Sequence, residues 1–400
     1  MSDETIIHRG YQSETFYFEK SGQSFIRKVF LQSNVGKDCF NQEKLAQKTF
    51  KQFDWMLPWE EEDNSMFVTK MFPSEHRLDL IAPQLSKEQQ QDATEQIMSI
   101  ILDLYVHGFA HCDLHAKNLF YHNSRVTLID YETLRKYPNG HPPPFFESYD
   151  LTGKGLKSPY ETGNMFFFKE HPVSICNILH VATLDEATEA LKTKIISELT
   201  SASTSFRKKQ GRLVPKKTMP YATFSLPTIE VKTAHRNSTR RLQQFEMNES
   251  DLRNKTLLDL GSHCGSMIFE SQKLKPKMCL GIEYDEDKVH VAKKIAAFAG
   301  LNHVQFKQGD LEKLSLKDLN HSFDVVYCLS IDAHVQNKEH LYRLLESVTK
   351  ELLLFEMNTL TPPKETIKDF QRLGFNTVSF LGYCDDERGN TTRALFKAWK

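Results

Sequence analysis

The residues best suited to chemistry in the first half of the chain lie between His111 and Asp130. The segment from His111 to Asn118 reads H-C-D-L-H-A-K-N, and an apolar run then leads to Asp130. Phosphoryl transfer needs an acceptor in line, a metal that neutralises charge and a group that receives the acceptor's proton. Asp113 can receive that proton, and Asn118 and Asp130 can hold Mg²⁺ on a nucleotide. The spacing therefore predicts phosphoryl transfer.

A small strand-rich lobe and a long helix precede this segment and must position it. Aromatic and β-branched runs and helical spacing predict a hairpin over 15–30, a helix over 41–50 and strands near 55–59 and 66–71. Ser86 and Gln89 form a capping-box pattern that opens a further helix, and Gly108 suits the end of that helix. The predicted order is a strand-rich lobe and then a helical lobe that carries the loop.

This first half resembles protein-kinase-like phosphotransferases, and it is most similar to the lipopolysaccharide-kinase and aminoglycoside-kinase branches. Their loops read H-x-D-x-x-x-x-N and then I-D-[FYW], which His111–Asn118 and Ile129–Tyr131 match. The resemblance covers about residues 10–185 and implies an α+β bilobal fold that uses ATP and Mg²⁺.

The same resemblance implies a role for each matching residue. Asp113 becomes the catalytic base, Asn118 and Asp130 the metal ligands, Lys28 the lysine that holds the phosphates and Glu43 its partner. It also implies an adenine-binding hinge near residues 71–75.

The first half departs from the family pattern in three places. No G-x-G-x-x-G precedes the first hairpin, where only Gly10 is available, and Tyr131-Glu132 replaces Phe-Gly after Asp130. No A-P-E segment follows, which favours a small-molecule or glycan kinase over a protein kinase. Arg27 stands beside Lys28, so the choice of lysine is open by one residue. A pseudokinase that only binds is the alternative interpretation.

A second constellation begins at L-L-D-L-G-S-H-C-G, which spans Leu257–Gly265. The pattern is a strand that ends in a turn, where Gly261 and Gly265 let the backbone approach a ligand. Glu283 ends the next predicted strand, where an acid can accept both hydroxyls of a ribose, and Asp310 follows the third strand, near an adenine amine.

Strand-like and helical segments alternate after this turn, which predicts an α/β Rossmann-like parallel sheet with helices on both faces. The predicted strands are 256–260, 278–283, 304–307, 325–329 and 352–355, and two later runs, 377–381 and 394–399, could close the sheet as a hairpin.

This series resembles class I S-adenosylmethionine-dependent methyltransferases over about residues 254–400. The resemblance implies that the cofactor-binding residues are Asp259, Gly261, Gly265, Glu283 and Asp310. A dinucleotide dehydrogenase is the rival interpretation, but His263 and Cys264 occupy the turn where its G-x-G-x-x-G would lie. Tyr284 either packs on the adenosine or is an ordinary aromatic residue at the start of a helix.

The methyl-acceptor site is less sharply indicated. No N-P-P-Y or D-P-P-Y tetrad is present, which disfavours methylation of amino groups on nucleic-acid bases. Asp332, His334 and Glu356 are candidate bases, or else ordinary capping and hydrogen-bonding residues. The arginines at 236, 240 and 241 could hold a phosphate with paired hydrogen bonds, or could form a solvated helix face. The acceptor-site prediction is therefore Asp332, His334, Arg236 and Arg240.

The two constellations together resemble the bifunctional kinase/methyltransferases that terminate O-antigen polysaccharide chains. The resemblance implies phosphorylation of a sugar or glycan terminus and methylation of the new phosphate, next to polysaccharide-assembly proteins at the inner membrane face. In those enzymes the methyltransferase comes first, whereas here it comes second. A small-molecule kinase with an independent methyltransferase is a further alternative.

Length, net charge and cysteine spacing limit these interpretations. The 400 residues allow a kinase-like domain at 1–200, a basic linker at 201–220 and a methyltransferase domain at 221–400. A net charge of -1 gives no reason to expect nucleic-acid binding. The seven cysteines form no C-x-x-C pair and the N-terminus lacks a signal pattern, so we expect a cytoplasmic protein, peripheral to a membrane if it acts at one.

Overall fold

The computed structural model describes residues 4–136, 175–180 and 184–400, apart from positions 64, 72, 204, 210, 211, 218, 359, 360 and 385–392. The chain divides into two compact units, Met1–Lys194 and Ile195–Lys400. Each unit is described by itself below. The irregular stretch expected after residue 136 lies outside the described residues.

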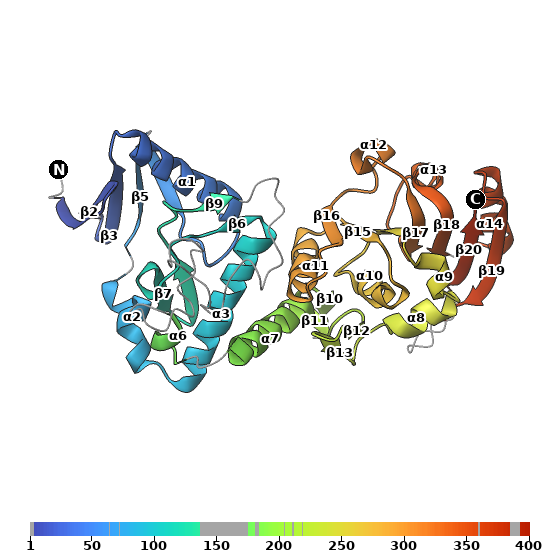
Figure 1. The fold of residues 1–400 in the computed structure, drawn as a ribbon, viewed down its shortest axis with the longest axis horizontal. Helices are drawn as coiled ribbons and strands as arrows, with labels where there is room; N and C mark the ends of the chain where they lie inside the picture. The colour runs from blue at the N-terminus through green and yellow to red at the C-terminus, as the bar shows by residue number, and fades with distance from the viewer. Residues whose placement is uncertain are drawn as a thin grey trace. The chain divides into compact units, whose positions relative to one another are not determined.

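The first unit opens with an antiparallel sheet of order β1-β2-β3-β5-β4 (Figure 1). Its strands are β1 (Thr5–Arg9), β2 (Ser13–Lys20), β3 (Gln23–Phe30), β4 (Trp59–Asp63) and β5 (Met66–Lys70). The predicted hairpin is confirmed as β2–β3. The strand expected over 55–59 was wrong, because Met56 forms only an isolated bridge to Leu128 and β4 begins at Trp59.

Helix α1 (Asn34–Phe50) follows β3, and the side chain of Ser33 caps it by accepting from the Gly36 N–H. The capping box of Ser86 and Gln89 is confirmed at the start of α3 (Lys87–Val106). Gly108 follows that helix with a φ of 81°. The remaining elements are α2 (Leu78–Ile81), β6 (Phe109–Ala110), β7 (Leu119–His122), β8 (Arg125–Leu128), β9 (Arg135–Lys136), α6 (Ile175–Ile178) and α7 (Leu184–Ala202).

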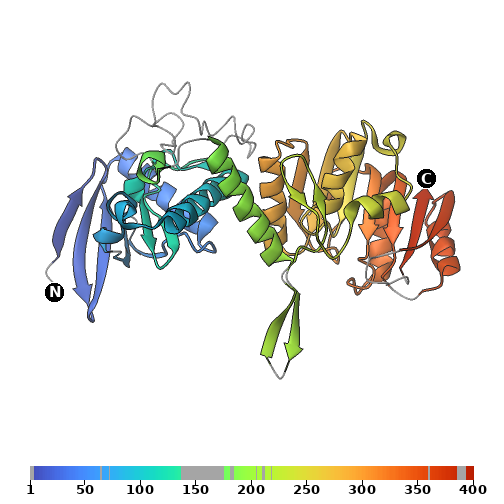
Figure 2. The ribbon, with the colours of Figure 1, turned by 90° about the horizontal axis from the view of Figure 1, so that it is seen from below.

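The basic stretch expected as a linker over 201–220 forms an antiparallel hairpin instead. Its strands are β10 (Ser205–Lys209) and β11 (Arg212–Lys217), drawn side by side in Figure 2. The apolar residues in this stretch are too few to produce a clear two-residue alternation. For that reason the sequence pattern hid the strands.

The second unit is built on a seven-stranded sheet of order β16-β15-β14-β17-β18-β20-β19. Neighbouring strands from β16 to β18 are parallel, and β20 runs antiparallel to both β18 and β19. The strands are β14 (Thr256–Leu260), β15 (Met278–Glu283), β16 (Val304–Gln308), β17 (Phe323–Leu329), β18 (Thr349–Glu356), β19 (Thr377–Tyr383) and β20 (Ala394–Trp399). All seven predicted strands and the closing hairpin are confirmed.

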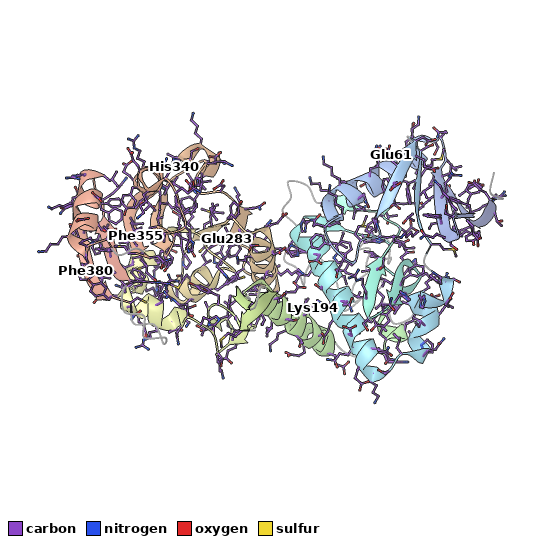
Figure 3. All side chains as sticks on the ribbon, turned by 180° about the vertical axis from the view of Figure 1, so that it is seen from behind. Glu61, Lys194, Glu283, His340, Phe355 and Phe380 are labelled. Atoms are coloured by element: carbon purple, nitrogen blue, oxygen red, sulfur yellow. The ribbon has the colours of Figure 1, made fainter. Side chains whose placement is uncertain are left out.

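Apolar side chains of the sheet form the core of this unit together with its helices. Phe355 on β18, labelled in Figure 3, is fully buried. Its ring lies edge-on against that of Phe370 on α14 (Pro363–Arg372), with 5.0 Å between the ring centroids. The other elements are β12 (Phe224–Ser225), β13 (Glu230–Val231), α8 (Ser238–Gln244), α9 (Glu249–Leu252), α10 (Ser266–Glu270), α11 (Glu286–Phe298), α12 (Leu316–Leu319), α13 (Lys338–Val348) and α14 (Pro363–Arg372). Among the described residues, no helix combines the length and apolarity that crossing a bilayer requires.

Candidate functional sites

A buried lysine surrounded by carboxylates marks the cleft of the first unit. Lys28 Nζ lies 3.2 Å from Glu43 Oε1, 2.6 Å from Asp130 Oδ1 and 2.7 Å from Glu132 Oε1. Strand β3 supplies the lysine, α1 supplies Glu43, and the two other acids follow β8. These four residues are called the lysine cluster below.

The alternation of side chains along β3 decides between the two basic residues. Arg27 forms ion pairs with Glu62 and Glu4. Successive strand residues point to opposite faces of a sheet, so Lys28 faces the cleft. The structure therefore places Lys28, and not Arg27, beside the predicted helix glutamate.

Burial and charge act in opposite directions on the lysine cluster. Burial lowers the pKa of Lys28, but the charges of Asp130 and Glu43 outweigh it and raise that pKa above its usual range. Burial raises the pKa of Glu43 to about 7 despite the opposing effect of Lys28. Burial also opposes ionisation of Asp130, yet the Lys28 charge lowers the pKa of that carboxyl. One cation thus holds three acids together.

The loop after β6 brings the remaining predicted residues to the same cleft. Asn118 Nδ2 donates to the Asp113 carbonyl at 2.9 Å and to Asp113 Oδ2 at 3.2 Å. Burial raises the pKa of Asp113. Cys112 and Asp130 have φ values of 63° and 67°, in the region that disfavours residues with a side chain, so the backbone is strained on both sides of the site.

A cavity of about 500 Å³ is lined by Lys28, Glu43, Asp113, Asn118 and Asp130 together with Glu132. The turn from Gly10 to Ser13, between β1 and β2, lines it as well, and Ser13 Oγ donates to Glu132 Oε1 at 2.7 Å. The hinge predicted near residues 71–75 does not line this cavity. Met71 and Glu75 border a separate hollow instead. Sequence reasoning missed Glu132, although its position two residues after Asp130 was a signal.

The second unit has a cavity of about 810 Å³ at the carboxyl ends of its parallel strands. Gly261, Glu283, Asp310 and Asp259 all line it. Gly261 has a φ of 74°, and a Cβ there would lie 2.1 Å from Ile331 Cδ1, so only glycine fits this turn. Glu283, labelled in Figure 3, accepts from the His263 N–H at 2.8 Å, which fixes its carboxylate beside the turn.

Asp259 is an unusual acid within this cavity. It is 3% exposed, and burial raises the pKa of its carboxyl to about 7, with the Arg241 charge acting against the shift and the Glu283 charge adding to it. Tyr284 also lines the cavity and is 72% exposed, so its ring is available to a ligand.

Gly265 does not line the cavity, contrary to the sequence prediction for it. It begins α10 with a φ of 82°, and a Cβ there would lie 2.5 Å from Phe306 Cζ. The residue is therefore glycine because of internal packing and a left-handed turn, and no direct approach to a ligand is needed to explain it.

The predicted acceptor residues separate in the structure. His334 lines the cavity, whereas Asp332 is buried, 1% exposed, and Oδ1 of Asp332 accepts from the Asn358 N–H at 2.6 Å. Arg240 is exposed on α8 and does not line the cavity. Arg236 is buried and forms an ion pair with Glu356. Asp332 and Arg236 therefore act in packing rather than as cavity-lining groups.

Glu356 is the centre of a second charged cluster. It is fully buried at the end of β18, where Arg241 Nε donates to Oε2 at 2.6 Å and Arg393 Nη1 lies 3.4 Å from Oε1. Burial opposes its ionisation, but Arg241 and Arg236 lower the pKa of its carboxyl to about 2. Glu356 is thus a permanent anion and not a base. Together with Arg236, Arg241 and Arg393 it is called the arginine cluster below.

The order of strands around the glycine turn agrees with a comparison of the sequence with known families. Residues 251–379 match a family model described as a methyltransferase domain. The second unit carries a class I S-adenosylmethionine-dependent methyltransferase domain. The match lies entirely in that unit, and it covers none of the residues of the lysine cluster.

Curated relatives match this methyltransferase domain over part of their length. The tRNA U34 carboxymethyltransferase of Desulfotalea psychrophila is 29% identical over 115 residues, 29% of this chain and 34% of the relative. The ubiquinone biosynthesis O-methyltransferase of Neisseria meningitidis is 27% identical over 121 residues, 30% of this chain and 50% of the relative. The chain thus spans a third to a half of these relatives' length.

A solved structure resembles the same part of the chain. The magnesium protoporphyrin IX methyltransferase of Synechocystis, solved with S-adenosylhomocysteine bound, is 17% identical and covers 40% of this chain and 80% of its own, with a TM-score of 0.32. The assignment of the domain rests on the family match and on the strand order, not on this likeness.

Proposed function

We propose that the second unit transfers the methyl group of S-adenosylmethionine and that the first unit phosphorylates a hydroxyl of a sugar or glycan with Mg-ATP. The methyl-transfer half is carried by one observation: Glu283 is held against the glycine turn of a cavity large enough for a nucleoside. An acid there can accept both ribose hydroxyls, and Gly261 leaves room for the backbone to approach the cofactor.

The phosphoryl-transfer half is supported by the lysine cluster. A strand lysine paired with a helix glutamate is the arrangement that positions the phosphates of a nucleotide in kinases. Asn118 uses its amide nitrogen to hold Asp113, which leaves its amide oxygen, with the carboxylate of Asp130, for a metal. Such oxygen ligands fit Mg²⁺, which would neutralise phosphate charge. Asp113 would accept the proton of the attacking hydroxyl.

The two reactions fit each other chemically if the product of the first is the substrate of the second. A phosphate monoester is already an oxyanion at neutral pH, so its methylation needs positioning but no base. This requirement suits the second unit, in which Asp332 and Glu356 are buried and fully engaged by neighbouring groups. The proposal places the enzyme in the cytoplasm, beside polysaccharide-assembly proteins at the inner membrane face.

A binding module in place of an active kinase is the second candidate. The turn at Gly10 favours this candidate, because it lacks the glycine-rich loop that would cover the phosphates of a nucleotide. Glu132 favours it too, because its ion pair with Lys28 occupies the cation that those phosphates would need. A small-molecule kinase with an unlinked methyltransferase is the third.

The test is methyl transfer from labelled S-adenosylmethionine to unphosphorylated and phosphorylated oligosaccharides, with and without Mg-ATP. We expect the unphosphorylated acceptor to be methylated only when ATP is present and not by the Asp113→Ala variant. The phosphorylated acceptor should rescue that variant, and the exposed-site variant Asp54→Ala should behave as wild type. Methylation that is independent of ATP would contradict the sequential scheme. Cofactor binding without any effect of Mg-ATP on stability would favour the binding module.

A further inference from the structure

The cavity of the second unit has two chemically different sides. β14, which ends in the glycine turn, lies between β15 and β17 in the sheet. On one side Glu283 ends β15 and Asp310 follows β16. On the other side Ser330 follows β17, Glu356 ends β18 and Arg393 precedes β20. Because β20 is antiparallel to β18, its first residue lies at the same edge as Glu356.

The side beyond β17 carries a connected set of cationic and hydroxyl donors. Ser330 Oγ donates to Glu356 Oε1 at 2.6 Å and accepts from Arg393 Nη1 at 3.1 Å. Arg241 Nη2 lies 3.3 Å from the same hydroxyl. Arg241 and Ser330 line the cavity that the cofactor would share, and Arg393, which does not line it, is joined to it through the Ser330 hydroxyl.

Among the described residues, the charges of this side do not balance. Glu356 supplies one negative charge, whereas Arg236, Arg241 and Arg393 each supply a positive charge that a guanidinium cannot lose by deprotonation. Arg393 Nε is buried and has no hydrogen-bond partner among the described residues. Three guanidinium groups thus share one carboxylate, so a second anion would complete the charge balance of the described residues.

We propose that Arg241, Arg393 and Ser330 form the subsite that binds the phosphate oxyanion of the methyl acceptor. This inference rests on the proposed methyl transfer by the second unit and adds the class of its substrate. Arginine suits the role because its planar donors match the oxygens of phosphate, and the serine hydroxyl adds a neutral donor. The acidic side of the cavity is left for the ribose and adenine of the cofactor.

The reaction balances without any further reagent. The bond between the sulfonium and its methyl group breaks, and sulfur keeps the electron pair. A phosphate oxygen forms a bond to the methyl carbon and loses one negative charge, so a monoester dianion becomes a diester monoanion. No proton moves, which is consistent with arginines rather than a base around the acceptor.

The same arginines could instead bind the carboxylate of the cofactor's methionine moiety. The experiment distinguishes the phosphate of the methyl acceptor from that carboxylate as the bound anion. The full chain is saturated with S-adenosylhomocysteine, which cannot donate a methyl group, and titrated calorimetrically with phenyl phosphate or benzoate. We expect phenyl phosphate to bind more tightly than benzoate and to lose about tenfold in affinity in Arg393→Gln. Arg393→Lys should lose less, and affinity for S-adenosylhomocysteine should stay unchanged.

Arg393→Gln leaves Arg236 and Arg241 on Glu356, so the variant keeps the main ion pairs of the cluster. Arg343→Gln, on the exposed face of α13, is the matched control and should bind phenyl phosphate as wild type does. Ser330→Ala gives a second variant without change of charge, and we expect it to weaken the binding of phenyl phosphate alone.

Loss of affinity for S-adenosylhomocysteine in Arg393→Gln would assign the arginines to the cofactor and overturn the proposal. Phenyl phosphate binding that Arg393→Gln leaves unchanged would overturn it too. A wild-type chain that does not bind S-adenosylhomocysteine at all would contradict the proposed methyl transfer itself.

Discussion

The two units hold clusters of opposite design. In the first unit one cation faces three acids, whereas in the second one acid faces three arginines. The lysine cluster consists of Lys28, Glu43, Asp130 and Glu132, and the arginine cluster consists of Glu356, Arg236, Arg241 and Arg393. All four residues of the lysine cluster line the cavity of the first unit, whereas the arginine cluster reaches the cavity of the second unit through Arg241.

The excess charge of each cluster can be relieved in a different way. Carboxylates can take up protons or share a metal ion, so the lysine cluster can adjust to an empty cleft. Guanidinium groups keep their charge at every physiological pH, so the arginine cluster can be relieved only by an anion. The first cluster can therefore be relieved by a proton or a metal ion, and the second only by an anion.

Removal of the only carboxylate from the arginine cluster should have the largest effect. We expect Glu356→Gln to lower the free energy of unfolding by about 3–5 kcal/mol, because it leaves buried guanidinium groups without a counter-ion that they cannot replace by losing protons. The measurement is urea unfolding, in which the transition that S-adenosylhomocysteine shifts should move and the other should not.

Glu351→Gln is the matched control for this change. Glu351 lies on the same strand, β18, and forms an ion pair with Lys255, but its side chain is 52% exposed. We expect a loss of less than about 1 kcal/mol, as for exposed ion pairs. Equal losses in the two variants would show that the arginines of the cluster are not electrostatically dependent on Glu356.

Removal of the only cation from the lysine cluster should cost less and should depend on pH. In Lys28→Met the main charge that opposes the effect of burial on Glu43 is lost, so the pKa of that carboxyl rises above about 7. Such an acid binds a proton in the folded state that it releases in the unfolded chain, so the free energy of unfolding falls as the pH rises from about 4 towards that pKa.

We therefore expect Lys28→Met to lower the free energy of unfolding by about 1–3 kcal/mol at pH 8 and by less at pH 6. The loss is smaller at pH 6 because Glu43, left without its cation, can take up a proton and become neutral. Urea unfolding at the two pH values measures the difference. Lys44 lies on α1 next to Glu43 and forms an exposed ion pair with Glu61. Lys44→Met is therefore the matched control and should show no such pH dependence. A loss of stability in Lys28→Met that does not depend on pH would show that the acids of the lysine cluster do not take up protons when their cation is removed.

The sequence predicted most of what positions these sites. The methyltransferase sheet followed from strand-like runs that alternate with helical spacing, because parallel strands buried on both faces are almost continuously apolar. Lys28, Glu43 and Asp130 lie together in the structure, as the resemblance to kinase-like phosphotransferases implied.

The failures concern residues whose role depends on distant partners. Arg236 was placed at the acceptor site because it is basic, and only the fold shows that it is buried against Glu356, 120 residues away. Arg393 was not singled out, because its place beside Glu356 and Ser330 depends on the antiparallel direction of β20. Gly265 looked like a ligand-binding glycine, yet a Cβ there would collide with the ring of Phe306 on β16.

Asp259, the acid inside the second cavity, behaves like a member of the lysine cluster, because its carboxyl can take up a proton. Burial raises the pKa of Asp259 to about 7, so this carboxyl is partly protonated near neutral pH in the empty cavity. A cofactor with a sulfonium charge favours the ionised form. Binding should then release a proton, and affinity for S-adenosylmethionine should rise with pH below that pKa and level off above it.

We expect an increase of up to about fivefold from pH 6 to pH 7 and of less than about twofold from pH 7 to pH 8, because the ionised fraction of an acid with a pKa of about 7 rises in that way. Calorimetric titration at the three pH values measures it, and Asp259→Asn should make the profile flat. Asp285→Asn is the matched control, since that residue lines the same cavity but its hydrogen bonds with Lys288 outweigh burial and lower its pKa. It is therefore ionised throughout the range, and its removal should shift the affinity without changing the profile. A flat profile in the wild type would mean that the bound sulfonium does not sense Asp259, and the acid would then belong to the packing of the strand end rather than to the charge balance of the cavity.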